Sequence, residues 1–193
     1  MDFRLFVLLN GAMRGHGHLD TLAADFATWS VPAFALATVA LWFLARPGGS
    51  PRWKLACVSG LASAGVGLLA AQAIGRAWPR ERPFAAHPTA TVLLTHRSRD
   101  PSFPSDHATA AFAVAFAVLA FSLRAGILFL CAASLIGASR VLVGLHYPGD
   151  VAGGALLGVA AALVVVLGAR APVARAVSLL GRASDPFVTR LRR

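Results

Sequence analysis

The stretch Ser139-Arg140-Val141-Leu142-Val143-Gly144-Leu145-His146-Tyr147-Pro148-Gly149-Asp150 lies between two strongly apolar segments of the chain. It brings an arginine, a histidine and an aspartate together in a sequence with few charged residues. A histidine with a carboxylate four residues later can serve as an oriented nucleophile or base, and an arginine can grip a phosphate with its planar set of donors. Such a polar interruption is more often only a solvated loop, so the rest of the chain has to decide between the two interpretations.

The composition is that of a membrane protein. Hydrophobic residues make up 57% of the 193 residues and charged residues 13%, against about 25% charged residues in soluble domains. The mean hydropathy is +0.68. The net charge of +10 comes from basic residues that cluster in loops and at the C-terminus, as in inner-membrane proteins. This distribution argues against nucleic-acid binding.

Five apolar segments are candidates for membrane-spanning helices, since a ~30 Å hydrocarbon core needs roughly 20 residues. We expect an all-α, polytopic membrane helix bundle with spans at residues 21–45, 55–74, 107–123, 127–143 and 151–169. Residues 3–9 are too short to span alone, and they form either an interfacial helix or a sixth span. A single domain is expected over residues 1–193, with its core at 21–169 and a basic cytoplasmic tail at 170–193.

The basic residues predict the orientation of the bundle. Arg46, Arg52, Lys54, Arg124 and the C-terminal arginines fall on one side if the five spans alternate. The positive-inside rule makes that side cytoplasmic, so the stretch from Ser139 to Asp150 faces outward from the membrane. The other long polar segment, residues 75–106, also faces outward. Its arginines lie on the side where the rule expects few basic residues. We attribute them to a site that binds an anion.

Residues 75–106 hold the second group of candidate functional residues. Prolines break any long helix there, and a connection of this length usually carries function or is disordered. It contains Arg82-Pro83 and leads into Pro104-Ser105-Asp106-His107. Its arginine and histidine content favours function.

The two polar segments together supply the parts of a phosphoryl-transfer site. That reaction needs cations on the phosphate oxygens, an oriented nucleophile and an acid for the leaving oxygen. The candidates are Arg76, Arg82 and Arg140 for charge, Ser105 and the following helix N-terminus for hydrogen bonds, His107 and His146 for proton transfer and attack, and Asp150 to hold a ring nitrogen of His146. No metal or other cofactor is expected, because the eight acidic residues are scattered.

The three motifs, Arg-Pro, Pro-Ser-x-His and Ser-Arg-x5-His-x3-Asp, resemble the signature of the type 2 phosphatidic acid phosphatase superfamily. Two positions depart from it: Gly75 stands where a Lys or Arg usually opens the first motif, with Arg76 next to it, and Asp106 replaces a Gly. The sequence around Glu81-Arg82-Pro83-Phe84 looks like that of the bacterial undecaprenyl-diphosphatase branch, whose enzymes confer bacitracin resistance.

The resemblance implies hydrolysis of the terminal phosphate of undecaprenyl diphosphate, which recycles the lipid carrier for peptidoglycan biosynthesis. It implies that His146 forms a phosphohistidine, that Asp150 orients it, and that His107 protonates the leaving oxygen. The residues implied to bind the phosphoryl group are Arg76, Arg82, Ser105 and Arg140.

Several alternatives remain open from the sequence. Glu81 either touches substrate or pairs with Arg80, and Asp106 is either catalytic or the N-cap of the third span. The substrate is a polyprenyl diphosphate or a phospholipid, so a phosphatidylglycerophosphate or phosphatidic acid phosphatase is an alternative. A lipid phosphotransferase, or a binding or transport protein with the same fold, is another.

Overall fold

The structure, a computed structural model, describes residues 1–13, 15, 17–45 and 50–191. Every regular element in these ranges is a helix, so the expected all-α class is confirmed. The elements are α1 (Asp2–Gly11), α2 (Gly17–Leu44), α3 (Arg52–Ala77), α4 (Pro83–Ala86), α5 (Asp106–Leu119), α6 (Leu123–Leu142), α7 (Pro148–Leu163), the π-helical turn η1 (Val164–Gly168) and α8 (Arg170–Leu191). Arg46 and the last two arginines of the expected tail lie outside the described residues.

Four of the helices are long and apolar enough to cross a membrane: α2, α3, α6 and the continuous segment of α7 and η1. The fifth apolar helix, α5, has 14 residues and is therefore about 21 Å long. It ends before the expected span of residues 107–123 does, because the chain turns and Ser122 caps α6 by accepting a hydrogen bond from the Ala125 N–H. The protein is a multi-pass membrane protein with a short central helix.

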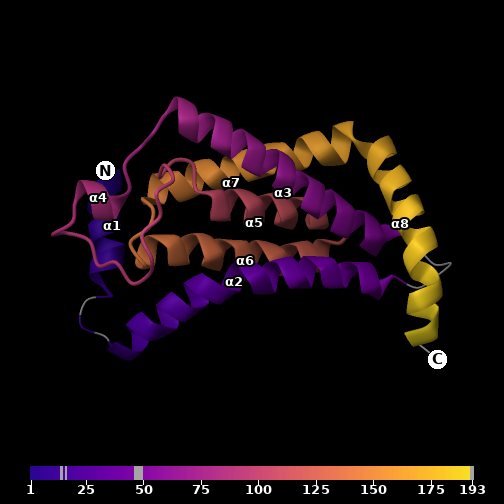
Figure 1. Cartoon of the computed structure of the whole chain (residues 1–193), viewed down its shortest axis with the longest axis horizontal. Coiled ribbons are helices and arrows are strands. Elements are labelled where there is room, and N and C mark those ends of the chain that lie inside the picture. The colour runs from indigo at the N-terminus through magenta and orange to yellow at the C-terminus, as the bar shows by residue number, and fades with distance from the viewer. Residues whose placement is uncertain (14, 16, 46–49, 192–193) are drawn as a thin grey trace.

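Helix α5 lies at the centre of the bundle. It packs against α3, α6 and α7 and also touches α2 (Figure 1). Most of its buried side chains are alanines, at positions 108, 111, 113, 115 and 117. Small side chains let neighbouring backbones approach closely, which is how membrane helices gain packing contacts in the absence of a hydrophobic driving force. The short helix is thereby surrounded by longer ones.

The contact between α5 and α7 depends on two glycines of α7. A Cβ atom on Gly158 would lie 2.4 Å from the Thr109 carbonyl oxygen, and one on Gly154 would lie 2.6 Å from the Ser105 carbonyl oxygen. Both obstacles are backbone atoms, so they cannot rotate out of the way. The glycines therefore fix how closely the start of α5 approaches the start of α7.

Helix α1 is docked at the end of the bundle that carries the long connections (Figure 1). It has ten residues, too few to span the membrane, so it is not a sixth span. The buried side chain of Asn10 binds the Val92 N–H, the Val92 carbonyl and the Leu142 carbonyl, each at 2.8 Å. These bonds tie α1 to the connection before α5 and to the end of α6.

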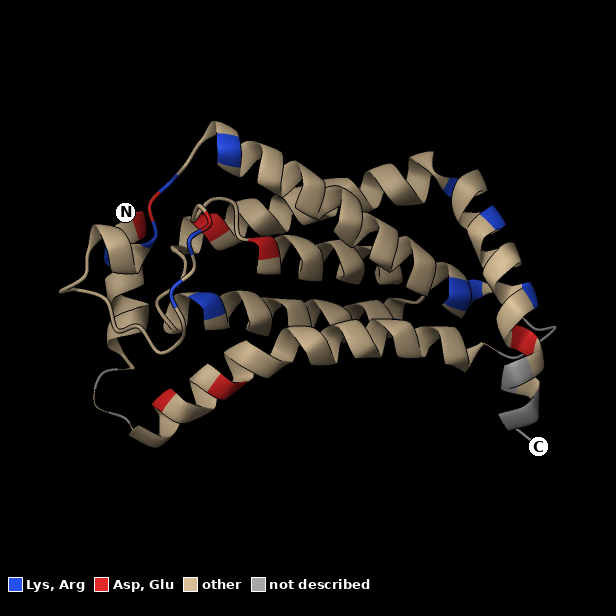
Figure 2. Ribbon diagram, in the orientation of Figure 1, with Lys and Arg blue, Asp and Glu red and all other residues tan. Residues whose placement is uncertain are grey.

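Helix α8 runs across the opposite end of the bundle (Figure 1). Among the side chains of α8 that the structure describes, Val173 and Val177 are the buried apolar ones. Lys54 of α3 forms an ion pair with Asp185, and the Trp42 indole donates to Ser184 at 3.0 Å. The expected basic tail is thus a helix anchored to the ends of α2 and α3. Figure 2 shows that the charged residues gather at the two ends of the bundle, with uncharged helix between them.

Replacing Gly158 by alanine should destabilise the protein, because the new methyl group meets backbone atoms of α5. We expect a loss of about 1–3 kcal/mol, the usual range for overpacking, seen as a lower midpoint in thermal unfolding of the detergent-solubilised protein. The matched control is Gly65→Ala in α3, where a Cβ atom meets nothing within 4 Å and alanine favours the helix. Equal midpoints for the two variants would contradict the close α5–α7 contact.

Candidate active site

The candidate site lies in the connections at the α1 end of the bundle. His146 sits in the turn between α6 and α7, and its side chain is almost completely buried. Gly144 makes this turn possible: its φ is +83°, and a Cβ atom there would lie 2.5 Å from the Val92 carbonyl oxygen. An L side chain rarely adopts this backbone conformation. The turn directs His146 towards the loop that precedes α5.

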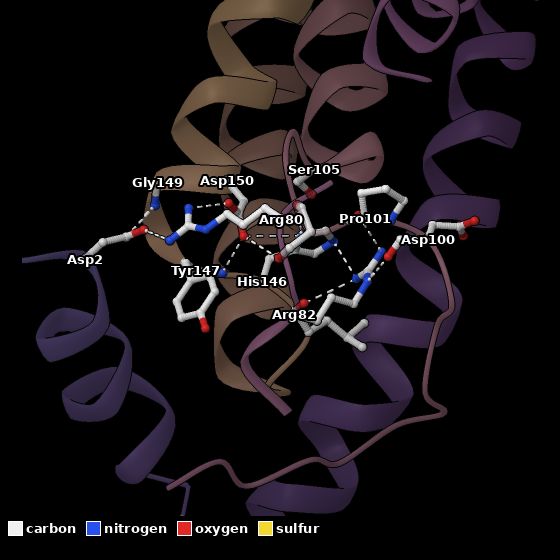
Figure 3. Close-up of polar contacts among 12 residues, drawn as sticks. Asp2, Arg80, Arg82, Asp100, Pro101, Ser105, His146, Tyr147, Gly149 and Asp150 are labelled. Carbon is white, nitrogen blue, oxygen red and sulfur yellow. Dashed lines mark hydrogen bonds and ion pairs between the residues drawn. The ribbon is translucent and has the colours of Figure 1, made fainter. Parts of the chain in front are cut away.

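Both ring nitrogens of His146 have a partner (Figure 3). Nδ1 lies 2.8 Å from the Ser102 carbonyl oxygen, and Nε2 lies 3.1 Å from Nη1 of Arg82. A carbonyl can only accept and a guanidinium can only donate. Nδ1 therefore carries the proton, and the lone pair of Nε2 faces Arg82. Burial lowers the pKa of His146, and the nearby Asp150 carboxylate opposes that shift.

Asp150 is fully buried and lies in the first turn of α7. Oδ2 accepts from the Ser102 hydroxyl at 2.5 Å and from the Tyr147 N–H at 2.9 Å, and Oδ1 accepts from Arg80 at 2.6 Å. Oδ2 is 3.9 Å from Nδ1 of His146, which is too far for a hydrogen bond.

The expected direct bond between Asp150 and His146 is thus replaced by an indirect link. Ser102 lies between the two side chains: its carbonyl takes the ring N–H, and its hydroxyl binds the carboxylate. The carboxylate is drawn away from the ring because it also caps the N-terminus of α7, where backbone N–H groups have no partner in the helix.

The arginines of the predicted phosphate site occupy different surroundings. Arg82 is buried and donates to the carbonyls of Asp100 (2.8 Å), Leu145 (3.2 Å) and Pro101 (3.4 Å). Arg140 is also buried; it donates to the Ser139 hydroxyl at 3.2 Å and to the Ala27 carbonyl of α2.

Arg76 is exposed at the end of α3. It lines a cavity of about 190 Å³, together with Gln72, Asp100 and Asp106. Arg76 therefore lies at the rim of the site, while Arg82 and Arg140 lie inside it.

The N-terminus of α5 contributes the Pro-Ser-Asp-His residues. Ser105 is the N-cap residue of α5, and Asp106 is the first residue of the helix, so the alternative that Asp106 is the N-cap is wrong. The Ser105 N–H donates to the Asp150 carbonyl at 3.0 Å. Its buried hydroxyl has no hydrogen-bond partner among the described residues. His107 is half-buried in the first turn of α5. Burial, followed by the nearby charges of Arg140, His146 and Arg82, lowers the pKa of His107 to about 4.

Three residues of this network are absent from the sequence-based candidates: Ser102, Arg80 and Asp2. Arg80 forms ion pairs with Asp150 and Asp2 and none with Glu81, which is exposed beside it. The described residues contain no group of three side chains that could hold a metal ion. The arrangement offers an oriented imidazole, buried cations and an unpaired hydroxyl at a helix N-terminus, the parts that bind and attack an anionic phosphorus centre.

Comparison with known proteins agrees with this chemistry. Undecaprenyl-diphosphatase BcrC of Bacillus subtilis is 32% identical over 153 residues, which cover 79% of this chain and 76% of the relative. Among solved structures, Aquifex aeolicus LpxE has a TM-score of 0.65 at 23% identity and covers 86% of this chain and 94% of its own. A PAP2-type phosphatidylglycerolphosphate phosphatase from Bacillus subtilis has a TM-score of 0.55 at 20% identity, with 84% and 91% covered.

The family model of the PAP2 superfamily matches residues 51–172. That segment contains all three motifs and every residue of the site except Asp2. With this match over more than half of its length, and with a relative so similar over most of it, the chain belongs to the PAP2 superfamily, as its motifs predicted.

Proposed function

We propose that this PAP2 phosphatase removes the terminal phosphate of undecaprenyl diphosphate and releases undecaprenyl phosphate. The observation that carries the proposal is the buried His146, whose Nδ1 is held by the Ser102 carbonyl while the Nε2 lone pair points at a cation. The substrate follows from the similarity to an undecaprenyl-diphosphatase over most of both chains.

The phosphoryl group binds where Arg82, Arg140 and the N-terminus of α5 converge. The Ser105 hydroxyl is buried without a partner, so a phosphate oxygen gives it the hydrogen bond that it lacks. Buried guanidinium groups bind oxygen anions strongly because little water competes with them. Arg76 lines a cavity together with Asp106, and we expect it to bind the second phosphate of the diphosphate.

In the first chemical step Nε2 of His146 attacks the terminal phosphorus. A nitrogen–phosphorus bond forms as the bond from phosphorus to the bridging oxygen breaks. His107 takes up a proton from solvent when the negative diphosphate binds beside it, because a nearby negative charge favours the imidazolium, and it gives that proton to the leaving oxygen. In the second step water attacks the phosphohistidine and passes a proton to His107. The nitrogen–phosphorus bond breaks, and inorganic phosphate leaves.

Asp150 and Ser102 stabilise the imidazole during attack. The ring gains positive charge when Nε2 bonds to phosphorus, while the proton on Nδ1 stays bonded to the Ser102 carbonyl. The Asp150 carboxylate, 3.9 Å from Nδ1, stabilises this charge through space. A fixed negative charge aimed at a site where positive charge develops lowers the barrier.

The charge distribution supports an outward-facing site in the bacterial cytoplasmic membrane. Arg52 and Lys54 begin α3, and Arg175 and Arg182 lie in α8 together with Asp185, the partner of Lys54. Most of the acidic residues, red in Figure 2, lie at the site end. Orientation depends on lysine and arginine rather than on net charge, so we attribute the arginines at the site end to the anion-binding site itself and take the α8 end as the basic side. The positive-inside rule places that end in the cytoplasm.

A glycerolipid phosphate is the second candidate substrate. One of the solved structures with this fold is a phosphatidylglycerolphosphate phosphatase. The chemistry at the phosphorus would be the same, and only the lipid would differ.

Phosphate release separates these candidates. The purified protein in detergent with EDTA is given undecaprenyl diphosphate, phosphatidylglycerophosphate and phosphatidic acid in parallel. We expect the fastest release from the diphosphate. A faster reaction with a glycerolipid would replace the proposed substrate, and no release from any of the three by folded protein would overturn the assignment as a phosphatase.

Replacing His146 by alanine should reduce phosphate release at least a hundredfold, because no other group can take its place as nucleophile in the buried site. His96→Ala, in an exposed part of the connection between α4 and α5, is the matched control and should retain wild-type activity. Thermal unfolding of both variants checks their folding. Residual activity of His146→Ala above a tenth of the wild-type value would refute the assignment of the nucleophile.

The rate should persist into mildly acidic solution. Burial lowers the pKa of His146 from its ordinary 6.5, so the ring stays neutral and nucleophilic at pH values where an exposed histidine is protonated. We expect the acidic limb of kcat/KM, which reports the free enzyme, to have its midpoint below pH 6.5. A midpoint above 6.5 would be inconsistent with a desolvated nucleophile.

A further inference from the structure

The carboxylate of Asp150 is held from one side by an arginine that lies outside the three motifs. Arg80, in the connection between α3 and α4, donates through Nη1 to Oδ1 of Asp150 at 2.6 Å (Figure 3). Its guanidinium also lies 4.2 Å from the centre of the Tyr147 ring, a cation–π distance. Arg82, by comparison, forms hydrogen bonds with main-chain carbonyls and with His146.

A second carboxylate fixes the other end of Arg80. Asp2, in the first turn of α1, accepts from Nη2 of Arg80 at 2.7 Å through Oδ2. Its Oδ1 accepts from the Gly149 N–H at 2.8 Å. Arg80 is thus held between Asp2 and Asp150, and both carboxylates also bind N–H groups at the start of α7.

Asp2 can approach the start of α7 because Gly149 has no side chain. A Cβ atom on Gly149 would lie 2.8 Å from Oδ2 of Asp2, so a side chain there would push the carboxylate away. Helix α1 is itself fixed in place: Phe6 is fully buried and packs edge-on against Tyr147, with ring centres 5.5 Å apart. The position of Asp2 is therefore set by packing as well as by charge.

We propose that Arg80 and Asp2 are positioning residues for the phosphoryl-transfer reaction, with Asp2 of α1 holding Arg80 against Asp150. A fully buried carboxylate needs a cation to stay ionised, and Arg80 is the arginine that forms an ion pair with Asp150. An ionised and immobile Asp150 in turn fixes Ser102, whose carbonyl orients His146. Neither Arg80 nor Asp2 contacts the reacting phosphorus in this scheme. The inference rests on the proposed function.

The test compares turnover with substrate affinity. Arg80→Met keeps the length of the side chain and removes its charge, and Asp2→Asn keeps an oxygen for the Gly149 N–H but weakens the hold on Arg80. We expect Arg80→Met to lower kcat at least tenfold, and Asp2→Asn to lower it severalfold, with KM within twofold of the wild type. Arg80→Lys, which keeps the charge, should recover most of the loss.

The double variant shows whether the two residues act as one unit. Once Arg80 is methionine, Asp2→Asn should have little further effect on kcat, because the pair is already broken. Arg4→Met removes an exposed charge from the same helix and serves as the control with unchanged kinetics. A purification tag belongs at the C-terminus so that it does not disturb Asp2.

The outcomes are distinct. Wild-type protein that releases no phosphate from any of the three lipids overturns the proposed function, and this inference with it. An active wild type with unchanged kcat in Arg80→Met overturns the inference alone. A raised KM with unchanged kcat also overturns it, since Arg80 would then bind substrate directly. If Arg80→Met does not fold, the test rests on Arg80→Lys and Asp2→Asn. The proposal expects a loss of kcat in Asp2→Asn and a smaller loss in Arg80→Lys. An equal loss in both variants, or no loss in either, contradicts it.

Discussion

The geometry of the whole site depends on one buried carboxylate, that of Asp150. It lies where the first turn of α7 meets three other segments of the chain. Asp150 is fully buried, and a buried charge is tolerated only when hydrogen bonds and an opposite charge surround it. Its oxygens therefore accept hydrogen bonds from the Ser102 hydroxyl, the Tyr147 N–H and the Arg80 guanidinium. Each of these partners brings part of the connections at this end of the bundle into a defined place. The orientation of His146 is a result of that arrangement, transmitted through the main chain of residue 102.

Close helix packing supports the same arrangement from within the membrane. Gly154 and Gly158 let α7 approach the backbone of α5, and the Ser105 N–H reaches the Asp150 carbonyl at 3.0 Å. The second and third motifs, more than thirty residues apart in the chain, are thereby fixed relative to each other at the starts of two packed helices. Helices hold functional groups more rigidly than loops do. The short α5 can carry one of these motifs because longer helices surround it (Figure 1).

Much of this organisation was predictable from sequence, and the exceptions have physical causes. Long apolar runs predict the helices because no other structure satisfies the backbone in lipid, and the order of the motifs predicts which residues meet. Ser102 gave no signal because its contact with His146 uses a carbonyl oxygen, which every residue has. Asp2 and Arg80 are far apart in sequence, so their pairing follows only from how α1 docks. The direct Asp150–His146 bond was expected from their spacing, but the spacing does not reveal that helix capping draws the carboxylate away.

The contact between Arg82 and His146 couples recognition to reactivity. One hydrogen bond of 3.1 Å occupies both the donor that would grip a phosphate oxygen and the lone pair that would attack phosphorus. The Nε2 lone pair cannot serve two partners at once, and Nη1 of Arg82 already divides its two N–H groups between His146 and the Leu145 carbonyl. An anion that accepts this N–H of Arg82 in place of His146 therefore frees the Nε2 lone pair at the same time. Ligand capture and unmasking of the nucleophile are then a single event, and a neutral electrophile that cannot compete for the guanidinium meets a histidine whose lone pair is already occupied.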